Sequence, residues 1–152
     1  MELRETVMAA LKRAMKDRDA ERLSTLRLIN AAIKDRDIAA RGEGREDGVD
    51  DTEVLGILGK MVKQRQESAR AYEEGGRIDL AERELKEIGY IEDFLPRQLT
   101  EEETAKAVDE AIAAVGAGSI RDMGKVMGAL KERYTGQMDF GTVGPMVKAR
   151  LT

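Results

Sequence analysis

The stretch SIRDMGKVMGALKERYTGQMDFGTVGPMVKARL, residues 119–151, predicts two amphipathic helices joined by a turn. Gly124 and Gly128 interrupt the first helix, although an interior glycine costs about 1 kcal/mol relative to alanine. The apolar residues around them recur at helical spacing and define an expected core face. This face consists of Ile120, Met123, Val126, Met127, Leu130 and Tyr134. The pattern thus indicates a helix despite the two glycines.

Both glycines fall on the side of this helix that faces away from the expected core. At about 100° per residue, the outer arc carries a set of cations, one acid and the two glycines. In angular order these are Lys131, Gly124, Gly128, Arg121, Glu132 and Lys125. A glycine at a solvated position lowers the stability of the helix without any gain in packing. We therefore expect that another group approaches the helix backbone closely at these positions. Two candidates stay open: another helix of the same protein, or a phosphate or ribose backbone neutralised by the cations.

The composition of the whole chain is also helical. The 152 residues are 41% hydrophobic and 37% charged but only 3% aromatic, and two are prolines. Strong helix formers dominate, and no run of β-branched residues alternates at period two. We therefore expect an all-α fold.

Helix start and stop signals divide the chain into seven segments. Four helices are expected in an N-terminal subdomain, residues 1–95, and three in a C-terminal subdomain, residues 96–152. The glycine-rich residues 41–50 predict a flexible loop. The second helix is expected to start near Asp19. The expected caps are Asp50 or Asp51, Thr100 with Glu103 in a capping box, and Ser119 with Asp122 at its third helical position. For the last helix the cap is either Thr142, which tolerates Pro145 in the first turn, or Asp139, which implies a kink.

The residues that are absent exclude several kinds of chemistry. The chain has no histidine and no cysteine, which removes the usual general base, the common transition-metal ligands and any thiolate nucleophile. We expect no catalytic residue, no bound metal and no cofactor. No apolar run has the length of a signal peptide core or a membrane span, so a cytoplasmic protein without membrane contact is expected.

The charge is unevenly distributed along the chain. The net charge of −4 argues against general nucleic-acid binding, and no DNA contact is expected. Residues 119–152 nevertheless hold six basic and three acidic side chains, whereas residues 51–118 hold nine basic and sixteen acidic ones. The basic C-terminal segment is therefore the candidate for a polyanionic partner.

Arg65 interrupts the apolar stripe of the third expected helix. A guanidinium at such a position must be paired or must reach past the apolar rim on its long stem. The favoured interpretation is a structural pair with an acid of the fourth or fifth helix, because buried charges are normally paired. The alternative is a guanidinium held for a partner.

Three stretches resemble one known family. They are RLSTLRLINAAIKDRDI, ESARAYEEGGRIDLAERELKEIGYIEDFLPRQLTEEE and MGKVMGALKERYTGQMDFGTVGPMVKARL. Together they are similar to the YqeY-like family, whose members share a domain with the tail of the B subunit of aspartyl/glutamyl-tRNA amidotransferase. The resemblance covers essentially the whole chain. Pro145 departs from the family pattern and affects how Lys148 is oriented.

The resemblance implies a helical N-terminal subdomain, a three-helix C-terminal subdomain and tRNA as partner class. The candidate RNA-binding residues are Arg121, Gly124, Lys125, Gly128, Lys131 and Lys148. Arg65 and Arg77 are candidates for a structural or partner contact. With only five aromatic residues, recognition by RNA shape and backbone is favoured over base stacking.

The leading hypothesis is therefore a non-catalytic tRNA-binding accessory protein, acting in translation with an aminoacyl-tRNA synthetase or an amidotransferase as an associated enzyme. The alternative is a protein-interaction module that docks onto such an enzyme. A hydrolase with a carboxylate pair would require a concave acidic pocket.

Overall fold

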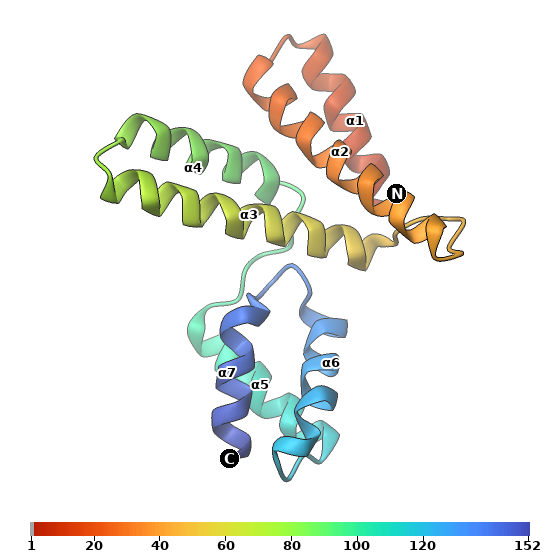
Figure 1. The fold of residues 1–152 in the computed structure, drawn as a ribbon, viewed down its shortest axis with the longest axis vertical. Coiled ribbons are helices and arrows are strands. Elements are labelled where there is room, and N and C mark those ends of the chain that lie inside the picture. Colours follow the sequence, from red (N-terminus) through yellow and green to blue (C-terminus); the bar gives the residue numbers. More distant parts are fainter. Residues whose placement is uncertain (1) are drawn as a thin grey trace. The chain divides into compact units, whose positions relative to one another are not determined.

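The computed structural model describes residues 2–152, and every regular element in that range is a helix (Figure 1). The predicted all-α class is confirmed. The chain divides into two compact units, an N-terminal unit of residues 1–95 and a C-terminal unit of residues 96–152. Each unit has its own hydrophobic core.

The N-terminal unit consists of two helical hairpins. The first hairpin pairs α1 with α2, and the second pairs α3 with α4. Their bounds are α1 Leu3–Lys16, α2 Ala20–Gly42, α3 Asp51–Glu74 and α4 Ile78–Glu92. Apolar side chains from all four helices meet in one core, which includes Val7, Leu26, Ile29, Leu58 and Ile91. Leu26, Ile29, Leu58 and Ile91 are among the most deeply buried side chains of the chain.

An ion pair ties α1 to α2 and to the loop that follows α2. Two guanidinium nitrogens of Arg4 donate to the Asp37 carboxylate at 2.8 and 2.9 Å, and one also donates to the carbonyl of Val49 at 2.7 Å. The Val49 amide in turn donates to Asp37 at 2.9 Å. The Arg4 guanidinium holds the pKa of Asp37 at about 2, well below its ordinary value.

The expected flexible loop at 41–50 is shorter and more ordered than predicted. Helix α2 continues to Gly42, and Val49 is buried in the core. Arg45 pairs with the Glu53 carboxylate, which anchors the middle of the loop to the first turn of α3. The sequence pattern missed these contacts because Asp37 and Glu53, which anchor the loop, lie outside it.

Gly48 is required where this loop crosses Asp37. Its φ of +76° is in the left-handed region, and a Cβ atom there would lie 2.3 Å from an Asp37 carboxylate oxygen. We expect Gly48→Ala to destabilise the N-terminal unit by about 2 kcal/mol, from backbone strain and displacement of the Asp37 carboxylate. Urea unfolding followed by circular dichroism measures this. Gly44→Ala is the control, because Gly44 also has a positive φ of +93° but open space around its Cβ position. Equal losses in the two variants would refute the Asp37 contact as a cause.

Most predicted helix caps are confirmed. Asp19 caps α2. Asp50 and Glu53 form a complete capping box at α3, which decides between the two expected caps. Thr100 and Glu103 form another at α5. Glu103 also pairs with Arg97, and this ion pair lowers its pKa to about 2.

The C-terminal unit is a three-helix bundle. It consists of α5 Glu101–Val115, α6 Met123–Tyr134 and α7 Phe140–Leu151, with the short 3-10 turn η1 Ile120–Asp122 before α6. The three helices pack pairwise around one core. Its members include Val108, Val126, Leu130, Val143 and Val147.

Two expectations for the start of α6 are wrong. The Ser119 side chain does not cap the helix, because η1 precedes α6 and the Asp122 carboxylate accepts from the Gly118 amide instead. Ile120 is 44% exposed and does not belong to the core face. The 3-10 turn changes the angular position of Ile120, since it advances about 120° per residue rather than about 100°.

The open question at the last helix is also decided. Asp139 precedes α7 and accepts from the Gly141 amide, so Thr142 is not the cap. Pro145 therefore lies inside the helix rather than in its first turn. Because proline has no N–H, the carbonyl of Gly141 lacks its ordinary helical donor.

Candidate nucleic-acid interface

The face of α6 opposite the core is open at both glycines. Gly124 and Gly128 are exposed. Outside the helix's own backbone, a Cβ atom at either position would have no heavy atom within 4 Å. Within the C-terminal unit, these glycines therefore do not serve packing against another helix, one of the two candidates from the sequence. They leave the backbone of α6 accessible over two successive turns.

Lysines flank this strip of backbone on both sides. At about 100° per residue, Lys131 lies just before Gly124 around the helix, and Lys125 lies beyond Gly128, with the exposed acid Glu132 between Gly128 and Lys125. Both lysines are exposed. The ammonium of Lys131 lies 6.0 Å from the ring centre of Phe140, the first residue of α7. The Lys131 edge of the strip therefore faces α7.

Lys148 is an exposed cation near the end of α7, the helix that packs against α6. Exposed lysines are thus present on both α6 and α7. We call these residues, Gly124, Lys125, Gly128, Lys131 and Lys148, the α6 face.

The cations of the α6 face are available for a ligand. Within residues 2–152, Lys125 and Lys148 have no ion pair, whereas Arg150 on the other flank of α7 pairs with Asp109 of α5 at 2.6 Å. Glu132 is the acid exposed on the same arc of α6. Arg121 is exposed but lies in η1, so it stands beside the helical arc and not on it.

Arg65 has a structural role. Its guanidinium donates to Glu87 of α4 at 3.2 Å and to the Met61 carbonyl at 3.2 Å, and its side chain is 14% exposed. The favoured interpretation from the sequence, a pair with an acid of the fourth helix, agrees with this geometry. Arg77 is exposed at the start of α4 and pairs locally with Asp79 at 3.3 Å. Neither arginine belongs to the α6 face.

The aromatic residues do not form a stacking surface. All five are partly buried: Tyr72, Tyr90, Phe94, Tyr134 and Phe140. Phe94 packs on the core of the N-terminal unit, and Tyr134 and Phe140 pack on the core of the C-terminal unit. The Arg22 guanidinium lies over the Tyr90 ring at 4.6 Å. A surface without free rings fits contact with a nucleic-acid backbone better than readout of splayed bases.

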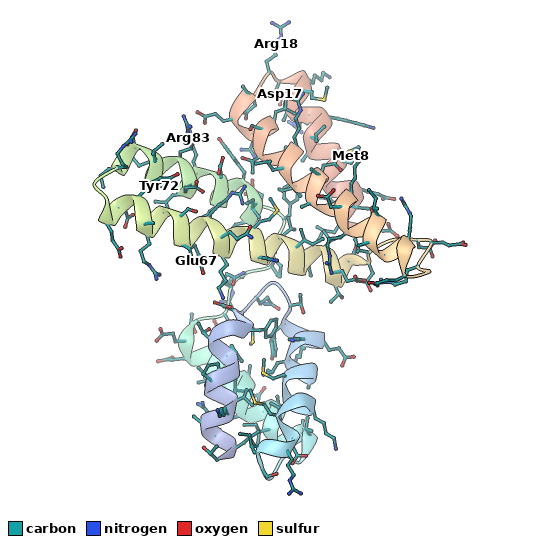
Figure 2. All side chains as sticks on the ribbon, in the orientation of Figure 1. Met8, Asp17, Arg18, Glu67, Tyr72 and Arg83 are labelled. Carbon is teal, nitrogen blue, oxygen red and sulfur yellow. The ribbon has the colours of Figure 1, made fainter. Side chains whose placement is uncertain are left out.

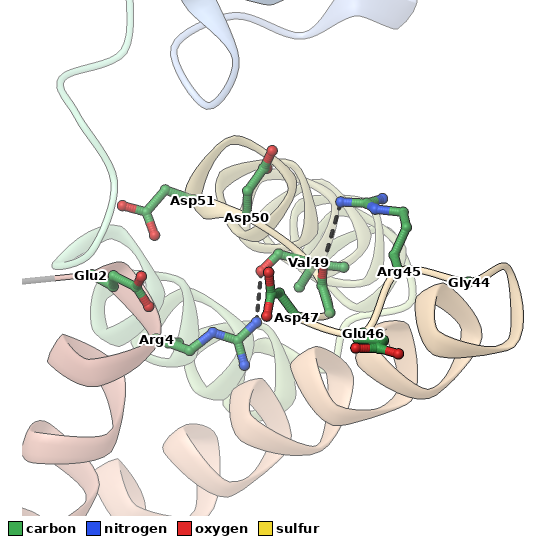
Figure 3. Close-up of a pocket in the computed structure, with 10 residues that line it drawn as sticks. Glu2, Arg4, Gly44, Arg45, Glu46, Asp47, Val49, Asp50 and Asp51 are labelled. Atoms are coloured by element: carbon green, nitrogen blue, oxygen red, sulfur yellow. Dashed lines mark hydrogen bonds between the residues drawn. The ribbon is translucent and has the colours of Figure 1, made fainter.

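A pocket of about 660 Å³ lies in the N-terminal unit beside the loop after α2 (Figure 3). Acids and two arginines line it, but Arg4 donates to Val49 and Asp37, and Arg45 pairs with Glu53. The arginines thus serve the fold rather than a ligand. Glu2, Glu46, Asp47, Asp50 and Asp51 make the rest of the rim acidic.

Neither a metal centre nor a membrane helix is found in the described part of the chain. No group of three or more His, Cys, Asp or Glu side chains in residues 2–152 could hold a metal ion. In the same range, no helix combines the length and apolar character needed to cross a bilayer.

These features define the class of protein: an all-helical chain of two units, with an exposed lysine and glycine face on its C-terminal bundle. A family model described as Yqey-like protein matches residues 4–151. The chain therefore belongs to the YqeY-like family, as the sequence resemblance indicated.

Curated relatives of the chain carry the name "Altered inheritance of mitochondria protein 41, mitochondrial". The protein from Lachancea thermotolerans is 33% identical over 85 residues, 56% of this chain and 43% of the relative. The Clavispora lusitaniae protein is 37% identical over 85 residues, 56% of this chain and 46% of the relative. The Eremothecium gossypii protein is 33% identical over 100 residues, 64% of this chain and 52% of the relative. The chain spans about half the length of these relatives. Their names contradict the predicted cytoplasmic location.

Proposed function

We propose that this protein is a non-catalytic accessory factor that binds folded RNA of the tRNA type through the α6 face. The single observation that carries the proposal is the open strip of helix backbone at Gly124 and Gly128 between exposed lysines. A phosphate or ribose can approach the backbone of α6 at these positions, where any side chain would keep it at a distance. Lys125, Lys131 and Lys148 then supply the neutralising charges.

Several properties of the chain support backbone recognition. No aromatic ring is fully exposed, so single-strand stacking has no platform. The resemblance to the tail of the tRNA-dependent amidotransferase favours a tRNA body as the ligand. The lack of His and Cys favours a protein that assists a synthetase or amidotransferase instead of catalysing a reaction itself.

Lys125→Ala tests the proposal. It should weaken binding to folded tRNA about threefold to tenfold, because one phosphate contact is lost. It should also lower the slope of log affinity against log salt by somewhat under one unit. Filter-binding titrations at several salt concentrations measure both quantities.

Lys106→Ala is the matched control, because Lys106 is an exposed lysine of the same unit on α5. Its affinity and salt slope should equal those of the unmodified protein. If Lys125→Ala and Lys106→Ala bind tRNA alike, the α6 face does not contact RNA. If the Lys125→Ala variant instead loses an associated enzyme in a pull-down with unchanged tRNA affinity, the face is a protein-docking surface.

A further inference from the structure

The α1–α2 hairpin carries a second exposed surface that the α6 face does not involve. A groove of about 430 Å³ runs between the two helices. Its apolar lining includes Met8 of α1 and Ile33 and Ile38 of α2. Met8, labelled in Figure 2, is 37% exposed, and Ile38 is 65% exposed. We call this surface the hairpin groove.

Along each edge of the hairpin groove, side chains of one kind are spaced seven residues apart. On α1, Met8 and Met15 are seven apart, and Met15 is 52% exposed. On α2, Arg27, Lys34 and Arg41 are seven apart and all exposed. Seven residues make almost two helical turns, so each set forms a row along one side of its helix. The groove is therefore continued along the hairpin by a methionine row and a cation row.

The cation row forms no ion pair within the part of the chain that the structure describes. Arg27 and Lys34 form no ion pair there, and Arg41 donates only to the Glu46 carbonyl at 3.4 Å. The other two charges at the groove wall, Arg4 and Asp37, neutralise each other. Glu5 is the one acid of the lining that is not paired with an arginine. The groove thus combines an apolar floor with a net positive edge.

We propose that the hairpin groove binds an acidic amphipathic helix of a partner protein. A helix that lies along an α-hairpin inserts its apolar stripe between the two helices, in the geometry of a three-helix bundle. Acids repeating at seven residues on that helix would match Arg27, Lys34 and Arg41 in charge and spacing. Met8 and Met15 suit such a contact, because methionine side chains adapt to the shape of an apolar partner.

The apolar side chains of the groove favour a protein helix over RNA as its ligand. The phosphates of an RNA backbone could contact the cation row, but RNA has no apolar stripe that would cover Ile38, Met8 and Met15. The proposal is independent of RNA binding by the α6 face, because it uses a different unit and a different set of cations.

A synthetic peptide serves as the probe. It has about 21 residues in three heptads, with leucine at positions a and d, glutamate at e and g, and a fluorescent label. The glutamates prevent the peptide from pairing with itself. Fluorescence anisotropy with the full chain should show saturable binding. The same peptide with lysine at e and g should bind at least tenfold more weakly.

Two variants of the chain, with one control variant, test whether the peptide binds in the hairpin groove. Ile38→Asp should weaken binding of the acidic peptide at least fivefold, since it puts a negative charge on the apolar floor. Leu28→Asp is the matched control: Leu28 is 47% exposed on the same helix but does not line the groove, so affinity should stay within twofold. Lys34→Glu should weaken binding of the acidic peptide and strengthen binding of the lysine peptide.

Three results would overturn the proposal. The first is no saturable binding of the acidic peptide by the unmodified chain, and the second is equal loss of binding in Ile38→Asp and Leu28→Asp. The third is loss in Ile38→Asp of affinity for folded tRNA, or for vesicles of phosphatidylcholine and phosphatidylglycerol, while peptide affinity is unchanged. An intact tRNA affinity in Ile38→Asp separates this inference from the proposed function.

Discussion

Replacing Asp37 with alanine is expected to destabilise the N-terminal unit by about 3 kcal/mol. The Asp37 side chain is 7% exposed and accepts hydrogen bonds from both ends of the Arg4 guanidinium and from the Val49 amide. Its removal leaves the buried Val49 amide without an acceptor and the half-buried Arg4 guanidinium with the Val49 carbonyl alone, and each donor left unsatisfied carries a desolvation cost. Urea unfolding followed by circular dichroism at neutral pH measures the loss.

Asp35→Ala is the matched control, because Asp35 is an exposed aspartate two residues earlier on α2. Its effect should stay within about 0.5 kcal/mol, the usual range for surface substitutions. If Asp37→Ala costs no more than Asp35→Ala, the Arg4 and Asp37 pair does not hold the hairpin and the loop together.

The same carboxylate makes stability depend on pH. The pKa of Asp37 is about 2 in the folded chain, below its ordinary value of 3.8. A lowered folded pKa adds stability that is present above the unfolded pKa and is lost as pH falls through the folded one. The stability difference between the unmodified chain and Asp37→Asn should therefore be constant above about pH 5 and shrink by about 2 kcal/mol towards pH 2.

Gly128→Leu is expected to reduce affinity for folded tRNA at least tenfold while the protein stays folded. The leucine would cover the accessible strip of the α6 backbone and keep phosphates away from both flanking lysines, a loss of about 1.4 kcal/mol or more. Stability should rise by about 0.5 to 1 kcal/mol, because leucine favours the helix over glycine and nothing lies near the Cβ position. A thermal melt and a filter-binding titration of one variant give both quantities.

Gly89→Leu provides the control. Gly89 is an exposed glycine inside α4, and its Cβ position also has no heavy atom within 4 Å. The variant should gain similar stability with unchanged tRNA affinity. A lower melting temperature in Gly128→Leu, with tRNA affinity intact, would mean that these glycines serve packing and would remove the RNA contact from this face.

The sequence predicted the helices well because their start and stop signals are local. Asp50 with Glu53 and Thr100 with Glu103 form capping boxes within four residues, and Gly116 ends α5 with a φ of +70°. The prediction was wrong at Ser119, where a 3-10 turn competes with a direct helix start. That competition depends on how Asp122 reaches the Gly118 amide, which residue types alone do not reveal.

The candidate site was predictable only in part. Helical periodicity predicted that Gly124, Gly128 and their neighbouring cations face away from the core, and these positions are exposed. Whether another helix covers them depends on tertiary packing, so the sequence left that open. The Arg4 and Asp37 pair joins residues 33 positions apart, and no local pattern indicates it. The seven-residue spacing of Arg27, Lys34 and Arg41 can be read from the sequence. Only the structure shows that an exposed apolar groove lies beside these cations.

The most direct test of the central claim is a salt titration of folded tRNA binding by the unmodified chain. Three contacting cations, Lys125, Lys131 and Lys148, predict saturable binding at low salt. They also predict a slope of log affinity against log salt of about −2 to −3, at 0.7 to 0.9 per phosphate. A slope near zero, or no binding at about 50 mM salt where such contacts are strongest, would contradict RNA binding by the α6 face.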